Sequence, residues 1–110
     1  MSRDITRILD RFNLAAPGAD TDIEANELIP AEGVTIFRIQ FSPTVATVLN
    51  IMETRSGTTF AGGLNSSAAV GAGDVAIFDV LVSDASTYNF QIETDGIIRQ
   101  LKVAELRGTV

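Results

Sequence analysis

Hydrophobic positions near the start of the chain follow the period of an α-helix. Four apolar residues recur at i, i+3, i+4 and i+7 within residues 3–12: Ile5, Ile8, Leu9 and Phe12. Ser2 is a suitable N-cap for such a helix. Pro17 disfavours helical backbone at the residue before it, and Gly18 admits turn conformations. The sequence therefore predicts one short N-terminal α-helix that ends at a Pro-Gly hinge.

After residue 18 the hydrophobic period changes to two, which is typical of β-strands. The clearest segment is residues 87–93, where Tyr88, Phe90 and Ile92 share one face and indicate core. Further strands are expected at residues 23–28, 34–41, 44–53, 58–61, 75–82 and 97–106. Closely spaced turns between them favour a mainly β fold, an antiparallel jelly-roll-like β-sandwich of about seven strands. We expect the helix and hinge at residues 1–18 and the β-sandwich domain at residues 19–110.

The dipeptide Asp95-Gly96 predicts one particular hairpin. Both central positions of a type I′ turn need positive φ, and Asp-Gly is a strong signal for that turn. Residues 87–93 should therefore pair antiparallel with residues 97–106.

Two expected strands are apolar on both faces. In one, Val45, Leu49 and Ile51 alternate with Ala46, Val48 and Met52; in the other, Val75, Ile77 and Leu81 alternate with Ala76, Phe78, Val80 and Val82. A strand with one solvated face should instead alternate between apolar and polar residues. A second covering layer is therefore implied, and either the N-terminal helix or a neighbouring subunit could provide it.

Composition limits the chemistry that this chain can perform. Its 110 residues include no histidine, cysteine or tryptophan, and its formal net charge is −6. The negative charge disfavours nucleic acid and anionic membrane surfaces as partners, because both need clustered cations. Charged residues at the very start leave no room for a secretory leader, so we expect a protein made in the cytoplasm and not secreted by a signal peptide.

Catalytic signatures are missing from the sequence. Serine nucleophiles would need Lys102 or a carboxylate for activation, and neither a Gly-x-Ser-x-Gly nor a Ser-x-x-Lys motif is present. Asp79, inside an apolar strand, is the best single candidate for an acid catalyst, but no partner for it can be named. We interpret it as a charge that blunts an edge strand or as a ladder salt bridge to Arg38 or Arg99. We expect no enzyme activity, no cofactor and no small-molecule substrate.

Three carboxylates are spaced at i, i+2 and i+4 at the entry to the first expected strand, at Asp20, Asp22 and Glu24. Such spacing could place oxygens around a calcium ion if the backbone curls there. The segment lacks the glycine and the terminal bidentate glutamate of a twelve-residue calcium loop. A solvated loop is the favoured interpretation, and no metal is expected.

The middle of the chain is unusually poor in charge. Between Ile39 and Gly73 only Glu53 and Arg55 are charged, and residues 56–73 are rich in glycine and other small residues. Small side chains let backbones of separate chains approach closely, so this stretch is either a subunit contact or a neutral loop. The N-terminal segment could likewise dock on a neighbour or fold back on its own domain. The expected interface residues are the large apolar ones of the two segments: Ile5, Ile8, Leu9, Phe12, Phe60, Leu64 and Val70.

Several segments resemble small β-sandwich structural proteins of tailed viruses of prokaryotes. They are residues 37–41 (FRIQF), 64–73 (LNSSAAVGAG), 78–80 (FDV), 88–91 (YNFQ) and 103–106 (VAEL). The resemblance implies a virion component, such as a capsid, decoration or tail protein, that is assembled in the host cytoplasm. It implies copies of itself and other virion proteins as partners. The alternative is a carbohydrate- or receptor-binding β-sandwich module, which would need an exposed aromatic platform.

Overall fold

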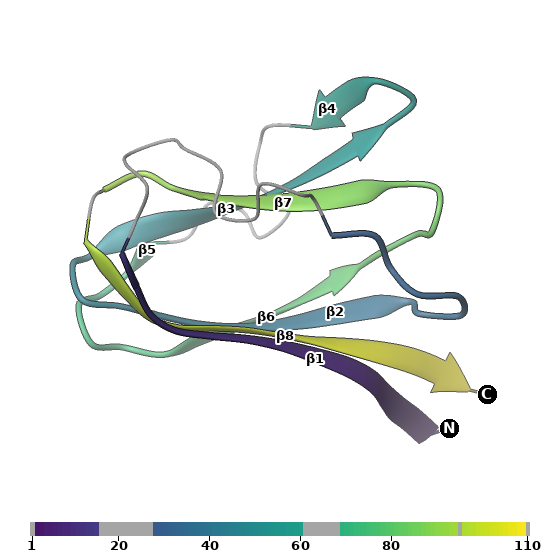
Figure 1. The fold of residues 1–110 in the computed structure, drawn as a ribbon, viewed down its shortest axis with the longest axis horizontal. Helices are drawn as coiled ribbons and strands as arrows, with labels where there is room; N and C mark the ends of the chain where they lie inside the picture. The colour runs from purple at the N-terminus through teal and green to yellow at the C-terminus, as the bar shows by residue number, and fades with distance from the viewer. Residues whose placement is uncertain (1, 16–27, 61–68, 95, 110) are drawn as a thin grey trace.

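The protein is mainly β and has two antiparallel sheets around a common core. The computed structural model describes residues 2–15, 28–60, 69–94 and 96–109. The strands are β1 (Ser2–Ala15), β2 (Ile36–Pro43), β3 (Thr47–Arg55), β4 (Thr58–Phe60), β5 (Ala69–Val70), β6 (Ala76–Leu81), β7 (Thr87–Ile92) and β8 (Ile97–Thr109). The two sheets form two layers (Figure 1), and the molecule measures 39 × 30 × 22 Å along its principal axes.

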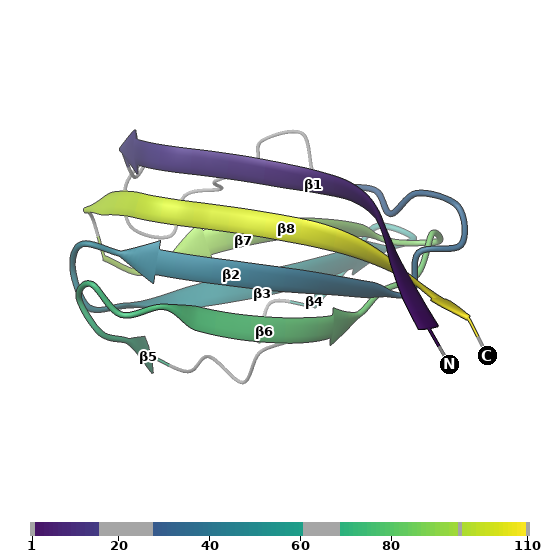
Figure 2. The same ribbon diagram turned by 90° about the horizontal axis from the view of Figure 1, so that it is seen from below.

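The first sheet contains four antiparallel strands in the order β1-β8-β2-β6. Figure 2 shows these strands side by side, with β1 at one edge and β6 at the other. In the second sheet β3 is central and pairs with β7, β4 and β5. Leu28 adds an isolated antiparallel bridge to Tyr88 on β7.

The core lies between the sheets and follows the two-residue alternation of the strands. Its fully buried side chains come from both layers: Phe37, Ile39 and Phe41 of β2; Leu101 and Val103 of β8; Leu49 and Ile51 of β3; Tyr88, Phe90 and Ile92 of β7. Each side chain of this kind contributes about 1.5–3 kcal/mol when it leaves water. The predicted core face of residues 87–93 is therefore confirmed.

The predicted N-terminal α-helix is wrong, because residues Ser2–Ala15 form strand β1 along β8. The register shows why the pattern was misleading. Ile5 lies opposite Leu106 and Ile8 lies opposite Ala104, so three steps on β1 match two steps on β8. This irregularity adds one residue to β1 and converts a strand period of two into an apparent spacing of i, i+3. An isolated helix of about ten residues is marginal in water, whereas pairing with a long strand gives hydrogen bonds at alternate residues along the whole segment.

The predicted hairpin between the last two strands is also wrong. β7 pairs with β3 in the second sheet, whereas β8 pairs with β1 and β2 in the first. The connection between β7 and β8 passes from one layer to the other and is held by two threonine hydroxyls. The Thr47 hydroxyl accepts from Thr94 N–H at 3.0 Å, and the Thr44 hydroxyl accepts from Ile97 N–H at 2.9 Å. These contacts favour a connection that crosses between the two sheets, and they disfavour a two-residue hairpin.

The other predicted strands agree with the structure to within a few residues wherever they are described. Residues 34–41, 44–53, 58–61 and 75–82 correspond to β2, β3, β4 and β6. The predicted strand at residues 23–28 lies outside the described residues except for Leu28. The short strand β5 was not predicted, because Ala69–Val70 sits in a stretch rich in small residues.

Candidate self-association surface

Strand β6 forms one edge of the first sheet and exposes one of its faces. It pairs with β2 in continuous register from Ile36 opposite Leu81 to Phe41 opposite Ala76. Ala76, Phe78 and Val80 point toward the core, where Val80 is buried and the other two are partly buried. Alternation therefore puts the odd-numbered residues on the outer face of the sheet.

The outer face of β6 carries a row of large apolar side chains. Relative exposure is 58% for Val75, 59% for Ile77 and 79% for Leu81. We call these three residues the β6 apolar row. Val75 directly precedes β6, and Asp79 lies between Ile77 and Leu81 on the same face. Single exposed hydrophobic residues are ordinary, but several on one side of one segment mark a surface for contact with another molecule. One face of the doubly apolar segment 75–82 thus packs on the core, and the other is uncovered in the single chain.

The one charge on the outer face of β6, Asp79, is neutralised by the neighbouring strand. Arg38 lies opposite Asp79 in the register, and its Nε and Nη2 donate to the two carboxylate oxygens at 2.9 and 3.0 Å. The hydrogen bond from Arg38 to Asp79, with the attraction between their charges, raises the pKa of the Arg38 guanidinium. Both side chains are about half exposed, so the pair adds little stability. The predicted ladder salt bridge from Asp79 to Arg38 is confirmed, and Arg99 instead donates to the Gly73 carbonyl at 3.0 Å.

The interface residues expected from the sequence are distributed over both sheets. Ile8 is exposed on β1, whereas Val70 is buried in the core of the single chain and does not offer its side chain to a second copy. Leu64 lies outside the described residues. The side chains of the remaining four also lie outside what the structure describes: Ile5, Leu9, Phe12 and Phe60.

The β6 apolar row was absent from the predicted interface. Its sequence signal was present, since residues 75–82 are apolar on both faces. That signal predicts a covering layer but does not say whether the chain itself supplies it. The exposure of these side chains in the folded chain shows that the outer face is uncovered.

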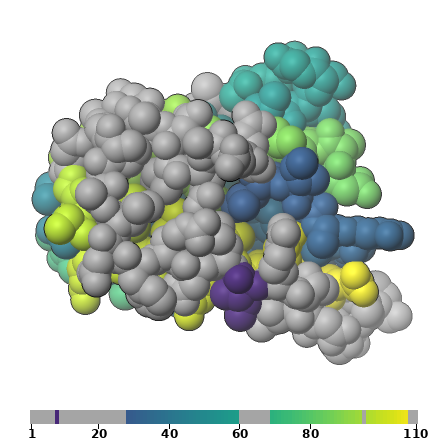
Figure 3. Space-filling view, in the orientation of Figure 1, coloured from purple at the N-terminus to yellow at the C-terminus, as the bar shows by residue number. Residues whose placement is uncertain are grey.

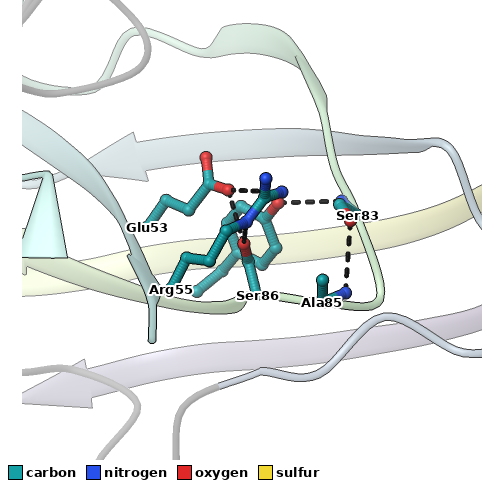
Figure 4. Close-up of polar contacts among 6 residues, drawn as sticks. Glu53, Arg55, Ser83, Ala85 and Ser86 are labelled. Atoms are coloured by element: carbon teal, nitrogen blue, oxygen red, sulfur yellow. Dashed lines mark hydrogen bonds and ion pairs between the residues drawn. The ribbon is translucent and has the colours of Figure 1, made fainter. Parts of the chain in front are cut away.

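A cluster of polar side chains holds the end of β3 against β7 (Figure 4). The Ser86 hydroxyl donates to Glu53 Oε2 at 2.6 Å and accepts from Arg55 Nε at 2.8 Å. Arg55 Nη2 also contacts Glu53 Oε2 at 3.4 Å. The Tyr88 hydroxyl accepts from Ser83 N–H at 2.9 Å. The cluster fixes the turn that leads into β7.

Burial and charge both act on the Tyr88 phenol in this cluster. Desolvation raises the pKa of Tyr88, and the nearby charge of Glu53 raises it further, while the hydrogen bond from Ser83 N–H opposes the shift. The ring packs edge-on against Phe37 of the other sheet, with centroids 5.3 Å apart and an interplanar angle of 70°. Tyr88 is therefore a core residue and does not form the exposed aromatic platform that a sugar-binding module would need.

The Ser86–Glu53 pair links the end of β3 to the turn before β7. Ser86 is buried, and its hydroxyl is engaged by both neighbours. Glu53 Oε2 is also in contact with Arg55 Nη2, so the carboxylate is held between the serine and the arginine. Beside the cluster, an open hollow is lined by Glu53, Arg55, Ser56, Thr58 and Thr59. The β3–β4 hairpin next to it projects from the molecule (Figures 1 and 3).

The candidate calcium ligands Asp20, Asp22 and Glu24 lie outside the described residues. Within the described ranges, no group of three or more His, Cys, Asp or Glu side chains could hold a metal ion. In the same part of the chain, no helix is long and apolar enough to cross a membrane.

Comparison with known proteins supplies no relative for this chain. No protein-family model, curated protein sequence or solved structure matches it.

Proposed function

We propose that this chain is a non-enzymatic, self-associating structural subunit, and that the assembly it builds is a virus particle. The observation that carries the proposal is the β6 apolar row, with Val75, Ile77 and Leu81 each more than half exposed. Fully burying one such side chain contributes about 1.5–3 kcal/mol, so contact between copies along this row is favourable. A mean hydropathy of +0.24 for the whole chain agrees with subunits that cover one another.

The strand pairing supports a jelly-roll fold for the proposed subunit. β1 pairs with β8, Leu28 pairs with β7, β2 pairs with β6, and β3 pairs with β4. In chain order, with Leu28 placed between β1 and β2, the outermost pair joins the first and last strands. Each further pair lies inside the one before it, so the pairs are nested. A long antiparallel ribbon that is folded over itself gives this nesting, and the two sheets of a jelly roll arise in this way. Jelly rolls include capsid and lectin domains, so the fold supports the class by analogy only.

The virion assignment is supported by the resemblance of segments that the structure places in strands. Residues 37–41 lie in β2, residues 78–80 in β6, residues 88–91 in β7 and residues 103–106 in β8. In such a particle the partners are copies of this chain and other virion proteins, and assembly takes place in the host cytoplasm. The subunits act by surface complementarity and need no cofactor.

Static light scattering on the purified chain tests self-association. The weight-average mass should rise above the monomer mass of 11.7 kDa as concentration increases. The double variant Ile77→Lys/Leu81→Lys should weaken association by about tenfold or more, because charged side chains replace apolar contact. Its unfolding midpoint should stay close to that of the wild type, since both positions are exposed.

The control variant is Ala85→Lys/Thr94→Lys, which adds the same charge at two exposed positions away from β6. It should associate like the wild type. A wild-type chain that remains a monomer at every concentration would contradict the proposed function.

A further inference from the structure

The two edges of the first sheet are protected to different degrees. β1 has a register irregularity between Ile5 and Arg7 and carries many charges along its length: Arg3, Asp4, Arg7, Asp10 and Arg11. β6 is regular over its six residues and carries one charge, Asp79. Monomeric proteins blunt sheet edges with bulges and charged residues. β1 has both devices, whereas β6 has a single carboxylate that Arg38 already neutralises.

The backbone of β6 presents hydrogen-bonding groups at this edge. Val82 N–H donates to the Thr35 carbonyl of the neighbouring chain segment at 3.0 Å. Residues of an antiparallel strand alternate between bonding toward one neighbour and bonding toward the other. Phe78 and Val80 therefore bond toward β2, as Val82 does, and the odd-numbered residues direct N–H and C=O away from β2. β2 is the strand that pairs with β6 within the described part of the chain.

A second copy of β6 is a suitable occupant, because the strand is complementary to itself in one antiparallel register. With Phe78 opposite Phe78 of the second copy, Val75 faces Leu81 and Ile77 faces Asp79 across the contact. A shift that puts the two Asp79 residues opposite each other would oppose like charges, which is destabilising. The first register pairs Val75 with Leu81 at both ends of the contact and places each Asp79 opposite Ile77, so the two carboxylates are not directly opposite each other.

We propose that two copies join edge to edge through β6, antiparallel, with Phe78 at the two-fold axis. The two four-stranded sheets then form one continuous sheet, and the two β6 apolar rows meet on its outer face. This inference rests on the proposed function and names the contact that it uses. Because both copies present the same surface, the contact closes as a two-fold pair.

The size of the contact indicates how it works. Two paired strands of this length meet over roughly 20 Å, which buries less than the roughly 1,000 Å² of a stable interface. The β6 pair is therefore reversible in dilute solution. It becomes persistent where other contacts hold the same copies together, as in a shell or tube.

Cysteine cross-linking tests the register directly, since the chain has no cysteine of its own. The variants Val75→Cys and Leu81→Cys replace exposed side chains that should lie opposite each other, about 5.5 Å apart between Cα atoms. Mixed at concentrations where light scattering shows association and oxidised with copper phenanthroline, they should give a disulfide dimer of one copy of each. Intact mass identifies this mixed dimer, because the two variants differ in mass.

Each variant alone should give little dimer, because identical positions lie roughly 20 Å apart along the paired strands. Ile8→Cys on β1 is the matched control, since Ile8 is an exposed apolar residue at the opposite edge. Cross-linking of Ile8→Cys to a β6 cysteine would show head-to-tail pairing and overturn the inference. Association without the mixed Val75–Leu81 dimer would overturn it too and leave the proposed function standing, whereas absence of association would remove both.

Discussion

Tyr88 connects the core of the protein to its polar cluster. Its ring contacts Phe37 across the two sheets, and its hydroxyl accepts the Ser83 N–H beside Glu53. Tyrosine is placed well for this task, because its body is apolar and its tip is a hydrogen-bonding group. The alternation of residues 87–93 predicts the buried ring. The partners of the hydroxyl depend on the turn before β7, which alternation does not describe.

The ionisation of Tyr88 should occur above the ordinary tyrosine range. Burial first, and then the charge of Glu53, raise the pKa of Tyr88 in the folded state. A raised pKa means that the neutral phenol contributes stability, which is fully present below about pH 10 and is lost as pH rises through the folded pKa. Absorbance at 295 nm reports this residue alone, because the chain has one tyrosine and no tryptophan.

The same titration in urea provides the control, and there the midpoint should return to about 10. The Glu53→Gln variant, folded, should titrate at a lower pH than the wild type because one cause of the shift is removed. A folded midpoint at or below that of the urea-unfolded chain would contradict the structural account of Tyr88.

At the scale of elements, β1 is the segment where local pattern and tertiary structure disagree. The apolar spacing of residues 3–12 suits a helix, yet the segment pairs along β8. β8 is 13 residues long and lies between β1 and β2, so it has a strand on each side only when β1 is in place. Pairing with a distant strand therefore outweighs local propensity here.

Deleting residues 1–15 should destabilise the whole domain. The deletion turns β8 into an edge and removes the long ladder between β1 and β8. We expect the free energy of unfolding in urea to fall by about 3 kcal/mol or more, a large share of the 5–15 kcal/mol of a typical domain. A variant lacking only residues 109–110, at the far end of the same ladder, is the control and should change little. Unchanged stability of the long deletion would show that β1 is an independent arm.

At the scale of the whole molecule, net charge and the apolar row act in opposite directions. Each copy carries a formal charge of −6, so copies repel one another at long range. The β6 apolar row attracts at contact, and Asp79, the charge on the same face of β6, is paired with Arg38. Assembly is therefore expected to depend on ionic strength.

Salt should strengthen self-association of the wild-type chain. Raising sodium chloride from about 20 to about 500 mM shortens the screening length and reduces repulsion between copies, while apolar contact persists. We expect the association constant from sedimentation equilibrium to rise by about threefold or more. The Ile77→Lys/Leu81→Lys variant should remain monomeric over the same range. Weaker wild-type association at high salt would show that ion pairs, and not the apolar row, hold the copies together.

The sequence by itself determined the β class and the core face around Tyr88 and Phe90, and it limited the salt-bridge partner of Asp79 to Arg38 or Arg99. These features follow from side-chain alternation and charge, which are local properties of a strand. Tertiary structure decided that residues 2–15 are a strand, that β7 and β8 lie in different sheets, and that β6 is an edge with one face uncovered. Each of those outcomes depends on which distant segments pair. Pairing is set by the free energy of the whole set of contacts, and a local pattern of apolar and polar residues does not specify it.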